Sequence, residues 1–536
     1  MPQPSADPAL PAAPIPALTD RLLRSWLRCR RRAWLDRHGP AERRRWSAHR
    51  ALSLQEEQQR FAALLPVPPG RGDAAAAAGA AGVVGLRLRG RLAGVAVEAH
   101  PPLLQRVEQP SRWGAHGYRP VLARQGYRLT REHRLVLTLW GRLLAEHQRA
   151  PVAEGLVLGM GEHGPQRQRL PLGGGLPRQL EEALARLADD LGRRRPPPLV
   201  SDRKKCVLCS WRGLCDQEAA AEGHLSEVSG IGGKRRDLLL GLGITSLPQL
   251  AACDPHWLAG ALEPHGDQHR DVAPLLVAQA RVQAAGRAER RPAAEDAGAG
   301  PALPELAEAA GVLLYDIESD PDARDDFLHG FLILKRGADG RWPDGAAAAQ
   351  APYLPLLALQ EHGEARLWRR LQALLARYPH WPLLHYGETE AIALLRLGRR
   401  CGAAEAELVA LKRRLVDVHQ RLRQRWRLPV NSYGLKAVAG WLGFRWSQKG
   451  VDGARCLLWW RQWRQAGPAA GRRPLERIFR YNADDSLATW AVARWLLAHD
   501  DGRPAPTGGA TNASGSDIAS ATPAASANRS SAAPSA

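Results

Sequence analysis

The sequence predicts an α/β multidomain protein in which two α/β domains flank a small helical unit. At 536 residues the chain is too long for a single hydrophobic core. Strand-like runs fill residues 83–130, and strands alternate with helices in residues 310–500. Between them, residues 225–285 carry helical patterns alone, and the stretch that follows is rich in Ala, Gly, Pro and charge, which is typical of a linker.

The two ends of the chain have compositions that cannot bury a core. The start lacks a basic segment followed by an apolar one, so it is not a signal peptide, and no run of about 18 apolar residues exists to span a membrane. We therefore expect a cytoplasmic protein. The predicted divisions are a disordered N-terminus (1–17), a first α/β domain (18–224), a helical unit (225–285), a linker (286–309), a second α/β domain (310–500) and a disordered tail (501–536).

The charge is strongly basic, with a formal net charge of +21 and an isoelectric point near 10.5. Only seven of the 75 basic residues are lysine, which a GC-rich genome would explain. Such a genome does not explain the excess of basic over acidic residues. The surplus favours a polyanionic partner, most simply nucleic acid.

The first domain is predicted to begin with helices over residues 18 to about 60, where leucines and Trp26 form an apolar stripe among arginines. The Gly- and Ala-rich stretch Gly70–Gly82 is predicted to be a loop. A helix is expected at Arg131–Gln148, which has leucines at every fourth position.

Three cysteines of the first domain lie within ten residues of one another: Cys206, Cys209 and Cys215. In a reducing compartment seven cysteines do not form a disulfide framework, so a metal site is the better interpretation. Three thiolates need a fourth, and Cys29 is the best candidate although it lies far upstream. By ligand type, four thiolates suit a 4Fe–4S cluster or Zn²⁺ equally.

The middle unit contains Gly230-Ile231-Gly232 ahead of an apolar helix, and this segment resembles a helix–hairpin–helix. The Gly230 and Gly232 turn lets backbone amides approach a phosphate, and the following helix N-terminus adds positive potential. Lys234 and Arg235 would add charge contacts. The alternative is a plain helical hairpin that packs between domains.

The second α/β domain opens with an apolar run that ends in Asp316-Ile317-Glu318. Strand side chains repeat every two residues, so both carboxylates point to one side, where they repel each other unless a cation lies between them. Oxygen ligands favour Mg²⁺ or Mn²⁺. Tyr481 and Asp485 are four residues apart and share a helix face. The alternative is that Asp316 and Glu318 are surface acids at a strand end.

This pattern resembles the DEDD-type exonucleases, whose RNase H-like fold has a mixed sheet. Their third acid ends an Asn-x-x-x-Phe-Asp segment, and Glu390 takes that place here, with Glu388 as the fallback. The resemblance implies that Asp316, Glu318, Glu390 and Asp485 bind two metal ions about 4 Å apart. Tyr481 would orient or help deprotonate the attacking water, and the ions would activate it and stabilise the leaving 3′-oxygen.

The cysteine pattern resembles the iron–sulfur staple of RecB-family nucleases, which have the PD-(D/E)XK restriction-endonuclease fold. The resemblance favours the 4Fe–4S cluster over zinc and implies that it pins the first helix to the end of the domain. The family's catalytic Asp, acid and Lys align with Pro102, Leu122 and Arg124, so we expect this domain to have lost its own chemistry. Glu98 or Glu108 would serve instead if the alignment is shifted.

The order of the three parts resembles a bacterial family of RecB-like nucleases over about residues 18–500. The resemblance implies a metal-dependent nuclease, a 3′→5′ exonuclease that acts on DNA or RNA in the C-terminal domain. The alternative is a catalytically inactive nucleic-acid-binding scaffold with an iron–sulfur cluster.

Overall fold

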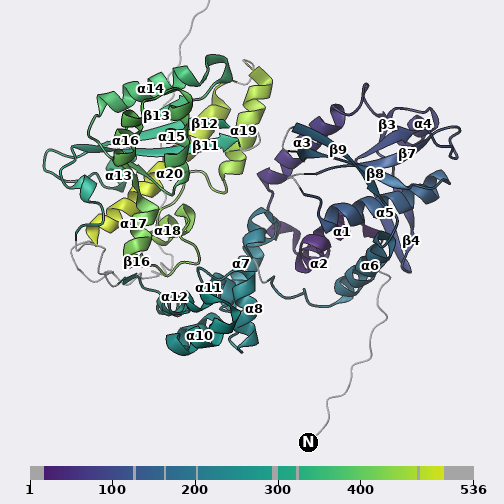
Figure 1. Cartoon of the computed structure of the whole chain (residues 1–536), viewed down its shortest axis with the longest axis horizontal. Helices are drawn as coiled ribbons and strands as arrows, with labels where there is room; N and C mark the ends of the chain where they lie inside the picture. Colours follow the sequence, from purple (N-terminus) through teal and green to yellow (C-terminus); the bar gives the residue numbers. More distant parts are fainter. Residues whose placement is uncertain are drawn as a thin grey trace, which may run out of the picture.

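A computed structural model describes residues 17–124, 128–161, 164–200, 203–291, 300–320, 325–467 and 471–499. Apart from Ala17, both segments predicted to be disordered, 1–17 and 501–536, lie outside the described residues. Two α/β lobes are joined by a helical unit (Figure 1), so the predicted α/β multidomain fold class is confirmed.

The N-terminal lobe combines two sheets with helices. The six-stranded sheet has the order β2-β3-β6-β7-β8-β9 and the three-stranded sheet the order β1-β5-β4. The strands are β1 (Leu18–Thr19), β2 (Gly70–Arg71), β3 (Gly82–Val84), β4 (Leu88–Leu92), β5 (Val95–Ala99), β6 (Leu103–Val107), β7 (Gly117–Ala123), β8 (Glu154–Gly161) and β9 (Gly164–Pro171). The helices are α1 (Asp20–Arg28), α2 (Arg30–His38), η1 (Ala41–Arg43), α3 (Ala48–Ala62), α4 (Gly72–Ala77), α5 (Arg131–Gln148), α6 (Leu176–Gly192), η2 (Arg203–Leu208) and α7 (Arg212–Ala221).

The stretch Gly70–Gly82, predicted to be a loop, instead holds the short helix α4. Alanine has the highest helix propensity, and the run of alanines after Asp73 outweighs the flanking glycines. Elsewhere buried carboxylates hold the helices together. Asp20 accepts a hydrogen bond from the Trp140 indole at 2.9 Å, and Asp190 accepts one from the Trp26 indole at 2.7 Å.

The middle unit packs its helices around a core of its own, which includes Leu225, Leu250 and Val277. Its helices are η3 (Leu225–Glu227), α8 (Gly233–Gly241), α9 (Leu247–Ala252), α10 (Pro255–Leu262), η4 (Glu263–His265), α11 (Asp267–Arg270) and α12 (Ala273–Ala285).

The segment predicted to be a linker, 286–309, differs from that expectation at both of its described ends. Strand β10 (Glu289–Arg290) pairs with β16 (Trp426–Arg427), and Ala302, Leu303 and Leu306 are buried in the core of the C-terminal lobe. Burial of these apolar side chains stabilises the fold, and a solvent-exposed linker would not gain that free energy. Residues 292–299 lie outside the described residues.

The C-terminal lobe contains a five-stranded mixed sheet in the order β13-β12-β11-β14-β15. The pairs β13-β12 and β12-β11 are antiparallel, and β11-β14 and β14-β15 are parallel. The strands are β11 (Gly311–Asp320), β12 (Asp325–Lys335), β13 (Tyr353–Leu357), β14 (Leu383–His385) and β15 (Leu415–Asp417). The helices are η5 (Pro304–Leu306), α13 (Gly345–Ala348), η6 (Gln360–His362), α14 (Glu364–Arg377), α15 (Thr389–Arg400), α16 (Glu405–Arg414), α17 (Val418–Arg425), α18 (Leu435–Trp441), α19 (Gly453–Ala466) and α20 (Arg473–Ala498).

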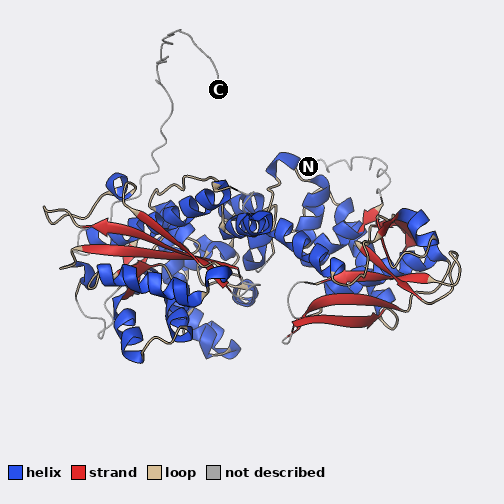
Figure 2. Cartoon of the chain, turned by 90° about the horizontal axis from the view of Figure 1, so that it is seen from above, coloured by secondary structure: helices blue, strands red, loops and turns tan. Residues whose placement is uncertain are grey.

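Helices cover both faces of this sheet (Figure 2). Leu313 packs into a cluster with residues of α14 and α15, whereas its neighbour Leu314 packs into a cluster with residues of α18 and α20. Side chains alternate along a strand, so both faces of β11 are buried, which explains its uninterrupted apolar run.

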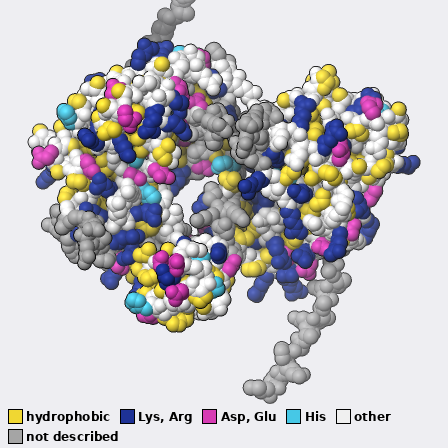
Figure 3. All heavy atoms as spheres, viewed as in Figure 1, with side chains coloured by type: hydrophobic (Ala, Val, Ile, Leu, Met, Phe, Trp, Pro, Cys, Tyr) yellow, Lys and Arg dark blue, Asp and Glu magenta, His cyan; other side chains and the backbone are white. Residues whose placement is uncertain are grey.

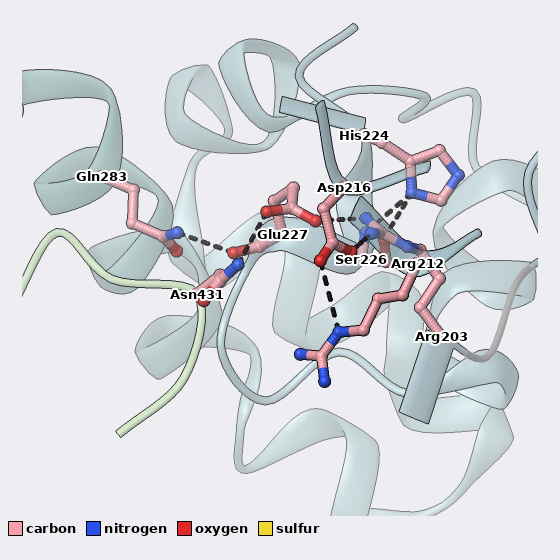
Figure 4. A network of polar contacts seen from close by, with 8 residues as sticks. All are labelled: Arg203, Arg212, Asp216, His224, Ser226, Glu227, Gln283 and Asn431. Carbon is pink, nitrogen blue, oxygen red and sulfur yellow. Dashed lines mark hydrogen bonds and ion pairs between the residues drawn. The ribbon is translucent and has the colours of Figure 1, made fainter. Parts of the chain in front are cut away.

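The lobes touch directly, and a polar network also links them through the middle unit. Helix α3 of the N-terminal lobe contributes Ala48 and Leu52 to a core cluster of the C-terminal lobe. In the network, Arg203 donates to Asp216 and Glu227, and Asn431 of the C-terminal lobe donates to Glu227 at 2.8 Å (Figure 4).

Within the described part of the chain, none of the helices combines the length and the apolar character that crossing a membrane would require.

Candidate active site

Three carboxylates meet where the end of β11 faces the long helix α20. Asp316 and Glu318 lie on β11, at even positions like Leu314, and therefore share the sheet face that α20 covers. Asp485 comes from α20. One oxygen of each of the three residues lies within 4.8 Å of the others.

Asn482 holds Asp316 in place. Its amide nitrogen donates to Asp316 Oδ2 at 2.6 Å, and its carbonyl oxygen accepts from the Tyr353 hydroxyl at 2.8 Å. Gly330 lies opposite Asp316 on β12, and a Cβ there would stand 1.8 Å from Asn482 Oδ1. The absence of a side chain at 330 therefore lets α20 approach the sheet closely enough for this contact.

Asp485 and its neighbour Asp484 have different partners. The Trp446 indole donates to Asp485 Oδ1 at 2.6 Å. Asp484 instead accepts two hydrogen bonds from Ser447, at 2.8 Å from the backbone and 2.7 Å from the hydroxyl. Asp484 is thus bonded outside the acid group, and Asp485 is the member of the pair that belongs to it.

Tyr481 is buried one turn before Asp485 on α20 and is hydrogen-bonded to it. The Lys436 ammonium lies 4.9 Å from the centre of the Tyr481 ring and donates to the Val451 carbonyl at 2.9 Å. Burial raises the pKa of Tyr481 far above its usual value, so its hydroxyl keeps its proton at neutral pH.

The acids of this site are hard to ionise in the absence of a cation. Burial raises the pKa of Asp316 well above its usual value, and the Asp485 and Glu318 carboxylates raise it further. Burial, and then Asp485, likewise raise the pKa of Glu318. The pKa of Asp485 rises to about 6, again because of burial, although the Trp446 and Tyr481 hydrogen bonds oppose the rise.

Glu390, the predicted third acid, lies in the first turn of α15 and is buried. It does not belong to the group of three whose oxygens lie within 4.8 Å. Burial raises its pKa to about 7, and Asp417 and Asp485 contribute. Its Oε2 is buried without a hydrogen-bond partner among the described residues. Glu388, the fallback, occupies the N-cap position of the same helix and is exposed.

The donor set fits a divalent cation. All three grouped ligands are carboxylates, which hard cations such as Mg²⁺ and Mn²⁺ prefer. Their raised pKa values report mutual repulsion and desolvation, both of which a bound cation would relieve.

A comparison with known protein families agrees with this geometry. Residues 313–497 match the RNase_H superfamily. The match spans the five-stranded sheet and α20, so the C-terminal lobe is an RNase H-like domain, and its acid group supports a nuclease that uses divalent metal. No curated protein matches the chain.

The four cysteines predicted to share a ligand lie near one another outside the RNase H-like domain. Cys29 caps α2, Cys206 lies in η2, and Cys215 lies in α7. Burial raises the pKa of Cys206 to about 11, and the thiols of Cys209, Cys29 and Cys215 all contribute. Cys29 thus lies close enough to Cys206 for the two thiols to influence each other, although among the described residues no three of the four sulfurs lie within 4.8 Å of one another.

The four predicted hairpin residues are two glycines at the turn before α8 and two basic residues within α8. Gly230 has a φ of 98°, which favours glycine, and Gly232 is the N-cap of α8. Lys234 is exposed to solvent. The Arg235 guanidinium instead donates to the Gly230 carbonyl at 2.8 Å and to the Gln268 carbonyl at 3.4 Å. Arg235 therefore stabilises the turn itself.

The positions aligned with RecB catalytic residues hold no comparable acid group. Leu122 and Arg124 are buried, and Pro102 precedes β6. Of the alternatives, Glu98 pairs with Arg87 at 2.6 Å, and the Glu108 side chain is 79% exposed. Within the described residues, the group of Asp316, Glu318 and Asp485 is the only one of its kind found.

Sequence reasoning missed the roles of Asn482 and Trp446, whereas Lys436 belongs to a segment, Tyr433–Lys436, whose sequence resembles the DEDD-type exonucleases. Asn482 could have been found, because it stands three residues before Asp485, and helical residues three apart share a face. Trp446 comes from a segment that carries no pattern of its own.

Proposed function

We propose that the RNase H-like domain is a 3′→5′ exonuclease that hydrolyses phosphodiester bonds of DNA or RNA. The observation that carries the proposal is the meeting of Asp316, Glu318 and Asp485, with one oxygen of each within 4.8 Å of the others, inside a domain that matches the RNase_H superfamily. Two bound divalent ions would supply activation of the attacking water and stabilisation of the leaving 3′-oxygen.

The residues around the acids have distinct roles in this proposal. Asn482 orients Asp316 through its 2.6 Å hydrogen bond. Tyr481 keeps its proton because of its raised pKa, so it orients the water by hydrogen bonding and does not act as a base. Lys436 brings positive charge to the Tyr481 side of the site.

Glu390 completes the ligand set in our proposal. Its buried Oε2 lacks a partner among the described residues, and a buried carboxylate oxygen without a partner is costly unless a ligand satisfies it. We expect Glu390→Gln to weaken Mn²⁺ binding about tenfold or more, as measured by calorimetry, and Glu390→Asp to restore part of it. Unchanged Mn²⁺ affinity in Glu390→Gln would exclude Glu390 as a ligand.

We further propose that the N-terminal lobe is a RecB-like domain whose four cysteines hold a 4Fe–4S cluster, with zinc as the alternative. The mutual influence of the four thiols supports a shared ligand. Iron, sulfide and zinc analysis of anaerobically purified protein, with Cys209→Ser as the comparison, distinguishes the two. Wild-type protein that contains neither iron nor zinc would contradict both the 4Fe–4S cluster and the zinc site.

The middle unit binds the nucleic-acid backbone as a helix–hairpin–helix in this proposal, in the cytoplasm. Basic side chains are spread over both lobes in Figure 3, which suits a polyanionic partner. Because Lys234 is exposed, Lys234→Ala should lower the slope of log affinity against log salt by about one, whatever the sequence bound.

The central test follows degradation of DNA and RNA strands labelled at the 5′ end, in the presence of Mn²⁺, so that loss of nucleotides from the 3′ end shortens the labelled strand. Wild type should shorten the strands, and Asp316→Ala and Asp485→Ala should each lower the rate at least about 1,000-fold. Asp484→Asn is the matched control, because Asp484 is bonded to Ser447 and lies outside the acid group. Equal degradation by all four proteins would contradict the proposed nuclease activity. It would leave the alternative, a catalytically inactive scaffold that binds nucleic acid.

A further inference from the structure

Trp46 is an exposed aromatic residue of the N-terminal lobe that lies against the catalytic domain. It stands between α2 and α3, two residues before α3 begins, and its exposed fraction is 57%. Tryptophan is highly buried on average, so an indole this open needs a reason.

Arg455 connects Trp46 to the acid group. Its guanidinium carbon is 3.9 Å from the centre of the Trp46 ring, which is within cation–π distance. Arg455 lies in the first turn of α19. In the same turn, a Cβ built on Gly453 would stand 3.7 Å from Glu318 Oε2. Arg455, which contacts the indole, is therefore only two residues from Gly453, the position on α19 that lies beside Glu318.

The segment that presents Trp46 is held on both sides. The backbone N–H of Arg45 donates to the Ser210 carbonyl at 2.9 Å, within the cysteine-bearing segment. After Trp46, Ala48 and Leu52 of α3 pack against α19. An aromatic ring fixed in this way loses little conformational entropy when it receives a ligand.

We propose that Trp46, backed by Arg455, is a base-stacking platform for single-stranded nucleic acid whose phosphate lies at the acids. The proposal rests on the proposed nuclease function. Every base offers a π-face, so such a platform tolerates any sequence, and Arg455 adds positive charge beside the strand. Bases of a duplex are already stacked, so the platform selects unpaired strands. A purely structural indole between α3 and α19 would be covered, whereas Trp46 is more than half exposed.

The test measures binding by the full-length protein, with Ca²⁺ replacing Mg²⁺ to slow hydrolysis. Fluorescence anisotropy follows labelled single strands of DNA and of RNA with the same sequence, each also prepared with one abasic site at successive positions. Trp46→Ala should weaken binding about 5- to 100-fold, and Trp46→Phe should stay near wild type. Leu54→Ala, which removes another exposed apolar side chain from α3, should leave binding unchanged.

The abasic series separates stacking from a structural role. At one position, the missing base should weaken binding by wild type about as much as Trp46→Ala weakens binding of the intact strand. The same missing base should not weaken binding by Trp46→Ala any further. The proposed platform would be overturned if Trp46→Ala bound the strands as tightly as wild type. It would also be overturned if each abasic site weakened binding by wild type and by Trp46→Ala equally. Cleavage that Asp316→Ala abolishes would still uphold the proposed function in that case. Cleavage that persists in Asp316→Ala would refute that function, while the binding comparison still decides the platform.

Discussion

Gly330 and Asn482 show how one missing side chain shapes the acid group. A Cβ at position 330 would meet Asn482 Oδ1 at 1.8 Å, so Gly330→Ala must push α20 away from the sheet. Asn482 would then lose its grip on Asp316, and Asp485 would move with the same helix. We expect destabilisation of about 1–3 kcal/mol and at least a 100-fold loss of cleavage, as measured by thermal unfolding and single-turnover rates.

Gly440→Ala is the matched control for this prediction. Gly440 lies in α18 of the same domain, and nothing stands within 4 Å of a Cβ built there. Alanine is favoured over glycine in a helix by about 1 kcal/mol, so this variant should be as active as wild type and equally stable or slightly more stable. Equal behaviour of the two variants would contradict the close approach at Gly330.

The raised pKa of Asp485 makes a prediction about pH. A carboxyl whose folded pKa exceeds its unfolded pKa stabilises the fold fully below the unfolded value and loses that contribution as pH rises through the folded value. For Asp485 this window runs from about 4, the unfolded value, to about 6. Metal-free wild type should therefore lose stability, of the order of 2 kcal/mol, relative to Asp485→Asn between these limits.

The measurement compares melting temperatures of the two proteins in a chelator across pH 4 to 8. Buried histidines such as His329, whose pKa burial lowers to about 4, act in the opposite direction in both proteins and cancel in the difference. Excess Mg²⁺ should raise the melting temperature of wild type more than that of the variant at pH 8. A pH-independent difference would show that Asp485 ionises freely without metal.

At the residue scale, the sequence predicts the groupings of side chains that follow from the local repeat of a strand or a helix. Asp316 and Glu318 share a strand face, and Tyr481 and Asp485 share a helix face, so their grouping follows from periods of two and 3.6 residues. The Trp446 bond to Asp485 spans 39 residues of sequence and follows from tertiary packing alone. Glu390 was selected by resemblance, and its distance from the group depends on how α15 meets the sheet.

At the scale of elements, α3 and α19 are joined by more than apolar packing. Arg461 of α19 bonds Asp320 at 2.8 and 2.6 Å and Glu56 of α3 at 3.1 Å. Asp320 is buried and stands two residues after Glu318. Arg461→Ala would leave a buried carboxylate without this partner, and we expect a loss of about 3–5 kcal/mol in thermal unfolding together with slower cleavage.

The neighbouring Arg464 provides the comparison. It belongs to the same helix and bonds Glu361 at 2.5 Å, but the two side chains are 31% and 57% exposed, against 21% and 9% for Arg461 and Asp320. Exposed pairs contribute at most about 1 kcal/mol, so Arg464→Ala should change neither stability nor cleavage appreciably. A loss in Arg464→Ala as large as that in Arg461→Ala would mean that α19 is sensitive to any change and that Asp320 has no special role.

Element boundaries also show where composition misleads. Glycine and alanine in 70–82 predicted a loop because both are small, yet alanine favours a helix, and α4 forms. The segment 286–309 was predicted to be a linker from its overall composition, while its few apolar residues, Leu303 and Leu306, are buried. Averaging over a segment hides the individual side chains that decide whether it packs.

At the scale of the whole molecule, Glu227 is the residue where three parts of the chain meet. Arg203 of the cysteine-bearing segment donates to its carboxylate, and Asn431 of the RNase H-like domain donates to its Oε2 at 2.8 Å. Gln283 of α12 donates to its backbone carbonyl at 2.7 Å. These contacts hold the two lobes in one arrangement, and the order of the domains in the sequence gives no hint of them.

Replacing Glu227 by alanine should therefore uncouple the lobes without unfolding either of them. Arg203 and Asn431 lose a shared acceptor, so unfolding of the two lobes should separate by several degrees in calorimetry, relative to their separation in wild type. Glu222→Ala removes an exposed acid at the end of α7 and should leave the calorimetric profile unchanged. Because α3 still packs against α19, single-turnover cleavage should fall only modestly, and a loss as large as that of Asp485→Ala would mean that the junction shapes the acid group itself.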